Sequence, residues 1–213
     1  MTGERQEGLS LNLIREDHVN RYQLVVEYLS GKTLSTGIDC FCGNGYGSRI
    51  LADAFPKVNI DAYDGSRSAI RTAKEVYRKK NIKFAPKMYP FDIKENYYDF
   101  AVSLESIEHT DMYENLLANL ISSLKPEGHL FISVPNEDKI PYQLNKNPYH
   151  VKHFTRSEIE DLVHSGGGKI IDYYGQDTYR VVDKTIKKLL PRDEMGLHKN
   201  HDGQFLLFVI EKA

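Results

Sequence analysis

Cysteine is scarce in this sequence, whose 213 residues include only two, Cys40 and Cys42. They lie two positions apart in a strand-like segment, where such residues share a face and sit about 6.5 Å apart. That arrangement is unfavourable for a disulfide, and two thiolates alone cannot complete a structural zinc site. We therefore expect two small buried side chains and a reducing, cytoplasmic compartment.

Long hydrophobic runs and an excess of one charge are also absent. The longest apolar run, Phe205–Ile210, is far shorter than the roughly 20 residues that span a bilayer, so we expect no membrane partner. The 28 Lys and Arg nearly balance the 30 Asp and Glu, with a formal net charge of −2. This balance argues against binding of duplex nucleic acid and leaves single-stranded nucleic acid open. The sequence predicts no particular oligomeric state.

Short β-type runs alternate with amphipathic helical patterns, which is typical of an α/β fold with a parallel sheet. At roughly 150 residues per domain, we expect residues 1–213 to form one three-layer domain with helices on both faces of the sheet. The alternation predicts seven strands, over Ser35–Phe41, Val58–Tyr63, Ile82–Ala85, Phe100–Leu104, His129–Val134, Lys169–Tyr174 and Phe205–Glu211. No typical crossover helix separates the last two strands, so we expect an antiparallel C-terminal strand.

The same alternation predicts the helices. They cover Ile14–Leu29, Tyr46–Phe55, Ser66–Lys80, Asp111–Leu124 and a final stretch between Thr155 and Ser165. Asp111 with Glu114, and Thr155 with Glu158, match the capping box that marks helix N-termini.

Two stretches, 135–154 and 175–204, do not follow the alternation. Loops of this length inside a compact domain usually carry function or structure of their own. We expect both of them, together with the N-terminal helix at 10–30, to form the substrate side of the domain.

The second stretch contains apolar residues at helical spacing. Val182, Ile186, Leu189 and Leu190 predict a short helix there. The basic residues of Lys184–Arg192 would then form a solvated helix face, and the alternative is that they bind an anionic substrate.

A glycine-rich segment follows the first predicted strand, and residues 38–47 read IDCFCGNGYG. Gly43, Gly45 and Gly47 lie between this strand and a helix, where glycine lets the backbone turn sharply and approach a ligand. The helix N-terminus then offers N–H groups to a polar or anionic group. Asp64 ends the next strand, where a carboxylate can bind both hydroxyls of a ribose. A tight turn alone could explain the glycines, but the combination predicts a nucleoside-cofactor site.

The glycine spacing distinguishes between nucleoside cofactors. The dinucleotide fingerprint is G-x-G-x-x-G, whereas the spacing here is G-x-G-x-G. The expected antiparallel hairpin at the C-terminus also differs from a six-stranded dinucleotide-binding sheet. Both features favour S-adenosylmethionine (SAM) over NAD.

Four segments together resemble class I SAM-dependent methyltransferases, over roughly Arg15 to Ile171. In this chain, IDCFCGNGYG resembles the family's glycine-rich cofactor motif, and NIDAYDGSRSAI resembles its ribose-binding segment. YYDFAVSLESIEH resembles its fourth strand with the following loop, and LKPEGHLFISVPN resembles its fifth strand. The resemblance implies a Rossmann-like fold and SAM as the cofactor. Two further segments, HVNRYQLVVEYLSGK and NPYHVKHFT, resemble a bacterial and phage subgroup often associated with methylation of surface sugars or other small molecules.

The resemblance also implies cofactor-binding residues for each part of SAM. The methionine end would be lined by Asp39, Gly43, Gly45 and Gly47, and its carboxylate would be held by Arg21 and Tyr22. The ribose would be held by Asp64, with Gly65 and Ser66 beside it, and the sulfonium side would be faced by Leu104 and Glu105. Family members often bind adenine through an acid after the third strand, but Ala85–Tyr89 contains none.

Two clusters of reactive residues follow the fourth and fifth strands, at the edge where open α/β sheets bind ligands. One reads Glu105-Ser106-Ile107-Glu108-His109, and the other reads Tyr149-His150-Val151-Lys152-His153. Methyl transfer depends mainly on orientation of the nucleophile, and a hydroxyl nucleophile also benefits from a base. The candidate bases are His109, His150 and His153, which Glu105 or Glu108 could orient.

The same clusters allow two other interpretations. Glu105, Glu108, His109 and His153 could bind a divalent metal that holds the hydroxyls of a substrate. Similar patterns occur in methyltransferases that act on RNA 3′ ends and on quinone precursors. Structural hydrogen bonding is the third interpretation.

The predicted function is therefore SAM-dependent methyl transfer. The expected acceptor is a hydroxyl on a small molecule such as a sugar or sugar nucleotide. Methylation of an RNA end, with or without a metal, is one alternative. A SAM-binding protein without catalytic activity is the other.

Overall fold

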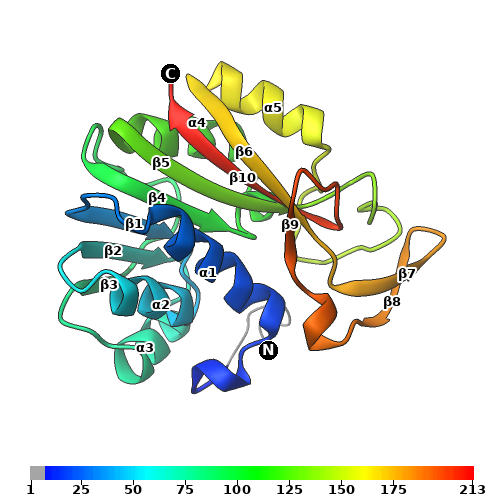
Figure 1. Cartoon of the computed structure of the whole chain (residues 1–213), viewed down its shortest axis with the longest axis horizontal. Helices are drawn as coiled ribbons and strands as arrows, with labels where there is room; N and C mark the ends of the chain where they lie inside the picture. Colours follow the sequence, from blue (N-terminus) through cyan, green and yellow to red (C-terminus); the bar gives the residue numbers. More distant parts are fainter. Residues whose placement is uncertain (1–7) are drawn as a thin grey trace.

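A mixed sheet forms the middle layer of the computed structural model, which describes residues 8–213 (Figure 1). Within these residues the sheet has eight strands in the order β3-β2-β1-β4-β5-β10-β6-β9. Their bounds are Thr36–Cys40 (β1), Asn59–Asp64 (β2), Ile82–Pro86 (β3), Tyr98–Leu104 (β4), Leu124–Pro135 (β5), Gly168–Gln176 (β6), Leu197–Lys199 (β9) and Phe205–Lys212 (β10). Strands β1 to β5 pair in parallel, and β10 lies antiparallel between β5 and β6.

All seven predicted strands are present, and the antiparallel C-terminal strand is confirmed. The predicted number is one too low, because β9 pairs with the end of β6. A three-residue strand inside a polar stretch has no alternation long enough to be detected. The predicted domain extends from residue 1, and its first seven residues lie outside the described part of the chain.

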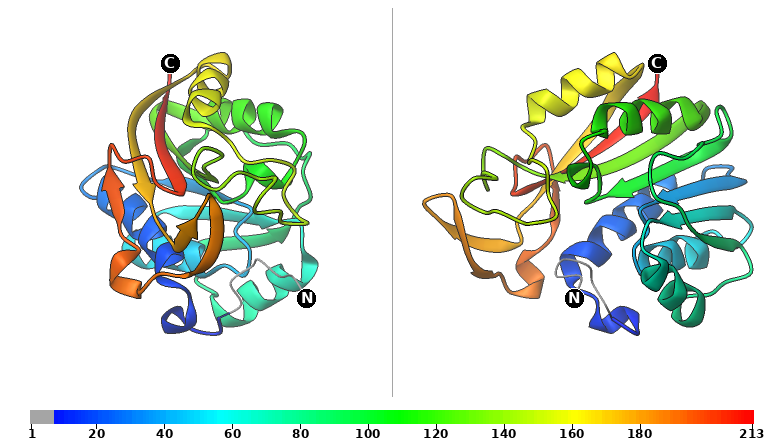
Figure 2. Two further views of the ribbon diagram at one scale, coloured as in Figure 1. Left: turned by 90° about the vertical axis from the view of Figure 1, so that its right-hand side faces the viewer. Right: turned by 180° about the vertical axis from the view of Figure 1, so that it is seen from behind.

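Helices cover both faces of the sheet (Figure 2). Their bounds are Glu16–Leu29 (α1), Tyr46–Ala54 (α2) and Arg67–Val76 (α3) on one face, and Tyr113–Ser123 (α4) and Arg156–Ser165 (α5) on the other. Successive residues of β10 show why two cores form. Leu207 and Val209 belong to the core on the face of α1, α2 and α3, and Leu206 and Phe208 belong to the core on the face of α4 and α5. This is the period-2 alternation of a strand buried on both faces. None of the described helices is long and apolar enough to cross a membrane.

One of the two predicted capping boxes is confirmed. The side chain of Thr155 accepts a hydrogen bond from the backbone N–H of Glu158, and the carboxylate of Glu158 accepts one from the backbone N–H of Thr155. The Asp111–Glu114 box is wrong, because α4 begins at Tyr113 and no side chain caps it. The hydroxyl of Thr110 accepts the Met112 N–H at 3.1 Å, so the preceding turn takes the place of the predicted cap.

The stretch 175–204 forms a hairpin where a short helix was predicted, and that prediction is wrong. Tyr179–Val182 (β7) and Thr185–Leu189 (β8) pair antiparallel as a separate two-stranded sheet. Asp183 and Lys184 between them both have positive φ, 47° and 58°, as two-residue type I′ turns require. Lys184, Lys187 and Lys188 therefore lie on a hairpin that projects from the sheet (Figure 1), and Arg192 begins the 3₁₀ turn Arg192–Glu194 that follows it.

The stretch 135–154 is a loop whose two ends meet. Asn136 forms a parallel bridge with Phe154. The side chain of Asn145 holds the loop against the hairpin, because it donates to the Lys184 carbonyl and accepts the Ile186 N–H, both at 2.8 Å. Both unusual stretches thus lie together at one end of the molecule.

Candidate functional site

A cavity of about 530 Å³ opens at the carboxyl ends of the parallel strands. Eight of the predicted site residues line it: Tyr22, Gly43, Asp64, Gly65, Ser66, Leu104, Glu105 and His109. Seven others lie outside the lining: Arg21, Asp39, Gly45, Gly47, Glu108, His150 and His153. The topology therefore brings the predicted cofactor segments and one predicted catalytic histidine to a single cavity.

Asp64 is fixed at the end of β2 by backbone groups. One carboxylate oxygen accepts the N–H of Gly43 at 2.9 Å, and the other accepts the N–H of Ser66 at 2.8 Å. The Ser66 hydroxyl in turn accepts the Ala69 N–H and caps α3. The acid is thus locked between the glycine loop and the start of the next helix, with its carboxylate in the cavity wall.

Gly45 and Gly47 allow the elements around the loop to pack closely. Gly45 has a positive φ of 87°, and a Cβ there would lie 2.7 Å from the side chain of Ala73. A Cβ on Gly47 would lie only 1.9 Å from the ring of Tyr22. Only glycine at these two positions lets α1 and α3 approach the loop without displacement.

Asp39 is a buried acid beneath the cavity. Its carboxylate accepts the hydroxyl of Ser48 at 2.5 Å and that of Tyr22 at 3.2 Å. Burial raises the pKa of Asp39 to about 6, and the charge of Asp64 adds to this effect. Because Tyr22 itself lines the cavity, this acid is one side chain removed from a bound ligand.

Arg21 is 1 % exposed and lies behind Glu105 at the cavity wall. Its Nε donates to the Gln176 side chain at 2.7 Å, and its two terminal nitrogens lie 3.6 Å from carboxylate oxygens of Asp17 and Glu105. One terminal nitrogen, Nη2, has no hydrogen-bond partner among the described residues. A buried donor of this kind favours an acceptor supplied by a ligand.

Glu105 lies at the point where β4 turns into the cavity. Its φ is 49°, a conformation that is uncommon for a residue with a side chain. Ser133 at the end of β5 holds it, because the Ser133 hydroxyl donates to the Glu105 carboxylate at 2.8 Å and the Glu105 N–H donates to that hydroxyl oxygen at 3.0 Å.

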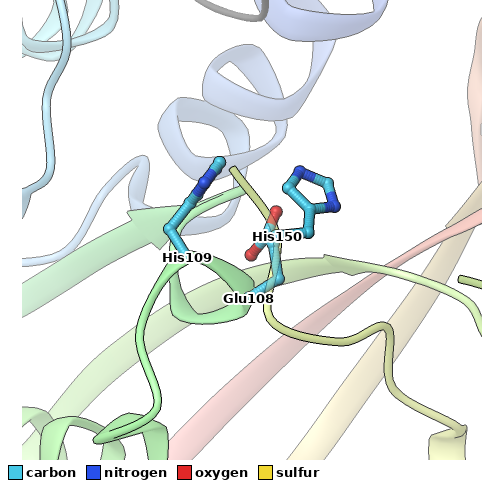
Figure 3. Close-up of side chains that lie close together, drawn as sticks. All are labelled: Glu108, His109 and His150. Atoms are coloured by element: carbon cyan, nitrogen blue, oxygen red, sulfur yellow. The ribbon is translucent and has the colours of Figure 1, made fainter. Parts of the chain in front are cut away.

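Glu108, His109 and His150 converge beside this turn (Figure 3). Glu108 and His109 belong to a short 3₁₀ turn, Ile107–His109, and His150 comes from the 135–154 loop. The group contains two of the four predicted metal candidates, Glu108 and His109. His153 instead bonds to the ring of His150 at 3.0 Å.

Several cavity residues were not predicted from the sequence. They are His18, Phe41, Cys42, Tyr46, Met88, Tyr89, Ser106, Thr110 and Tyr149. Phe41 has a positive φ of 64° inside the glycine-rich loop, which no local sequence signal marks. Burial lowers the pKa of His18 to about 3, with the positive charge of Arg21 as the next cause, so its ring is neutral in the cavity wall.

Comparisons with known proteins agree on the family. The sequence model of the methyltransferase domain family matches residues 14–172. The chain is 32 % identical over 107 residues to a ubiquinone biosynthesis O-methyltransferase of Rickettsia typhi, which covers 49 % of this chain and 43 % of that protein. It is 25 % identical over 181 residues to a probable S-adenosylmethionine-dependent methyltransferase of Mycolicibacterium smegmatis, which covers 82 % of this chain and 67 % of that protein. The match to the Rickettsia protein thus spans less than half of its length.

Solved structures show the same fold. A SAM-dependent methyltransferase from Thermotoga maritima has a TM-score of 0.66 at 17 % identity, with 92 % of this chain and 89 % of that chain covered. One from Clostridium acetobutylicum has a TM-score of 0.66 at 13 % identity, with 92 % of both chains covered.

The residues of the cavity fit SAM as a ligand. A nucleoside with a positively charged amino-acid arm requires an acid at the ribose, a close approach of the backbone and polar groups at the far end. Asp64 and the loop at Gly43 offer the first two of these at one cavity, and the buried Arg21 lies behind Glu105 in its wall. The chain therefore belongs to the methyltransferase domain family.

Proposed function

We propose that the protein transfers the methyl group of SAM to a hydroxyl of a small molecule. The observation that carries this proposal is a single cavity lined by Asp64, by the glycine loop and by His109. Relatives named ubiquinone biosynthesis O-methyltransferases support an oxygen acceptor on a small molecule. A sugar or sugar nucleotide, as in the bacterial and phage subgroup, is one such small-molecule acceptor. The names of the ubiquinone biosynthesis relatives do not support a sugar in particular.

The proposed roles of the cofactor residues follow the path from β2 to β4. When bound, SAM supplies a methyl group on a positively charged sulfur. Asp64 accepts hydrogen bonds from the ribose hydroxyls, with Gly65 and Ser66 beside it, and exposed Met88 with Tyr89 covers the adenine. The methionine arm follows Gly43 above Asp39 and Tyr22, with Gly45 and Gly47 as supports of the loop, and Arg21 reaches its carboxylate. Leu104 and Glu105 face the sulfonium.

His109 is the proposed base, because it alone of the three candidate histidines lines the cavity. Its Nδ1 lies 3.0 Å from the Tyr149 carbonyl oxygen. A carbonyl can only accept, so Nδ1 carries the proton and Nε2 of the neutral ring is the basic nitrogen. His150 and His153 stand behind it, and Glu105 is the carboxylate nearest the sulfonium side.

We assign the substrate side of the single domain to the helix at 10–30 and the stretches 135–154 and 175–204. The helix at 10–30 contributes His18 and Tyr22 to the cavity, and the loop 135–154 contributes Tyr149. The stretch 175–204 supports α1 from behind through Gln176. Two free buried cysteines are consistent with the expected cytoplasmic compartment.

Calorimetry with SAM tests the cofactor site. Asp64→Ala should weaken SAM binding by roughly 100-fold or more, because two hydrogen bonds to a charged group contribute about 1.5–3 kcal/mol each. Exposed Asp92→Ala is the matched control and should bind SAM like the native chain. Equal affinity of the Asp64 variant and the control would contradict the assignment.

Methyl transfer to a panel of phenols, sugars and short single-stranded RNAs tests the acceptor. We expect demethylated cofactor to form with a small-molecule hydroxyl, and His109→Ala to lower kcat by about 10²–10⁴-fold. The five basic residues of the hairpin region, Arg180, Lys184, Lys187, Lys188 and Arg192, favour RNA as the second candidate acceptor. Turnover with RNA alone would replace the small-molecule proposal.

A further inference from the structure

Glu108, His109 and His150 form a group that we call the Glu–His–His trio (Figure 3). One carboxylate oxygen and one nitrogen from each ring all lie within 4.8 Å of one another. One carboxylate and two imidazoles suit divalent transition metals, whereas Mg²⁺ and Ca²⁺ prefer oxygen ligands alone. We propose that the trio binds one divalent transition-metal ion at the edge of the cavity.

The backbone holds the two parts of the trio together. The Val151 N–H donates to the Glu108 carbonyl at 2.7 Å, and the His109 ring donates to the Tyr149 carbonyl at 3.0 Å. The rings of His109 and His150 meet edge to face with centroids 4.7 Å apart. The turn after β4 and the 135–154 loop are thus clamped at two points, which fixes the spacing of the three ligand atoms.

Hydrogen bonds behind the trio set the tautomers that a metal needs. Nδ1 of His153 lies 2.7 Å from the Ile140 carbonyl, so it carries the proton and Nε2 of the neutral ring accepts. That Nε2 lies 3.0 Å from Nδ1 of His150, which must therefore donate. His109 and His150 then both keep their proton on Nδ1 and offer Nε2 as the ligand atom. Metal-binding histidines are usually oriented in this way by a carbonyl or a second side chain.

This arrangement differs from the metal set predicted from the sequence. His153 acts as a positioning residue behind His150, and the Glu105 carboxylate bonds to Ser133. The Asn147 amide nitrogen lies 3.3 Å from Nε2 of His150. A metal ion would displace this long contact.

The burial of the trio gives the ion an open side toward the cavity. Glu108 is fully buried and His150 is 9 % exposed, while His109 lines the cavity. Three protein ligands leave at least one position of a tetrahedral ion for another ligand. With the ion bound, Nε2 of His109 is a ligand and no longer the base. A hydroxyl of the acceptor on the open position would then lose its proton to solvent more readily, as metal-bound water does. This last step rests on the proposed function, but binding of the ion does not.

Cobalt titration of the full chain tests the proposal, because Co²⁺ bound by nitrogen ligands absorbs visible light. After treatment with a chelator, the native chain should bind one equivalent of Co²⁺ with saturable absorption. Glu108→Gln and His150→Ala should weaken binding by roughly 100-fold, and His153→Ala by about 10- to 100-fold. Asn147→Asp removes the competing donor but keeps the oxygen that accepts the Tyr149 N–H at 3.0 Å, so this variant should bind Co²⁺ at least as tightly as the native chain.

Exposed residues provide matched controls, and SAM calorimetry on each sample reports folding. Glu114→Gln and His164→Ala should leave Co²⁺ binding unchanged. The proposal is overturned if a native chain that binds SAM shows no saturable Co²⁺ absorption, or if Glu108→Gln and His150→Ala bind Co²⁺ like the controls. A native chain that binds Co²⁺ at the trio but not SAM would support the metal site and contradict the proposed function.

Discussion

Asp39 makes the stability of this protein depend on pH in an unusual direction. The carboxyl has no exposure to solvent, and burial raises its pKa from 3.8 to about 6 despite hydrogen bonds from Ser48 and Tyr22. Between these two values the folded chain keeps a proton that the unfolded chain has already lost. This contribution to stability is therefore fully present below pH 3.8 and is lost as the pH rises through about 6.

Replacement of Asp39 by Asn should remove this dependence. A difference of about two pH units corresponds to about 3 kcal/mol at about 1.36 kcal/mol per unit. The free energy of unfolding of Asp39→Asn, relative to the native chain, should thus rise by about 2 kcal/mol between pH 4 and pH 7, which is most of this total, and then level off. The neutral amide keeps the volume of the carboxyl, so little repacking is expected.

Urea unfolding of both proteins at half-unit pH intervals measures this difference. The comparison cancels the titration of every other group that is unaffected by the substitution. A constant difference from pH 4 to pH 7 would refute the raised pKa. A difference that falls with pH would show that the hydrogen bonds to the ionised carboxylate outweigh the cost of its burial.

Three further substitutions test how the loop, the helix cap and the buried arginine work. Gly47→Ala should lower the free energy of unfolding by about 1–3 kcal/mol, because the new methyl overlaps the Tyr22 ring. The control Gly196→Ala, whose Cβ would meet nothing closer than 3.7 Å, should leave thermal unfolding nearly unchanged. Thr155→Ala should lower stability by about 1 kcal/mol through loss of the helix cap, and an unchanged urea midpoint would contradict this. Arg21→Met should weaken SAM binding about tenfold or more, because one charge-assisted hydrogen bond is lost. If the variant and the native chain bind SAM with equal affinity in calorimetry, the cofactor carboxylate lies elsewhere.

The part of the cavity formed by the glycine loop and Asp64 was predictable because its signals are local. Gly43 lies just after β1 and Asp64 ends β2, both strands have a strong hydrophobic pattern, and their parallel pairing brings the two strand ends together. The three histidines could not be sorted from sequence, because they lie in turns and loops without periodicity. His153 donates to the Ile140 carbonyl and accepts from His150, and neither contact has a signal in the sequence.

Residues beyond the family match support α1, which lines the cavity through His18 and Tyr22. The match ends at residue 172, yet Gln176 accepts from Arg21 at 2.7 Å and Thr178 donates to Asp17 at 3.2 Å. Hydrogen bonding and positive neighbours hold the pKa of Asp17 far below its usual value despite burial. The hydroxyl of Thr178 therefore donates to an ionised carboxylate at neutral pH. Because α1 carries Tyr22 into the cavity, a change at Gln176 would move a cavity wall without touching a ligand. Differences in acceptor among relatives with the same cofactor loop are therefore to be sought in the stretch 175–204 as well as in the cavity lining.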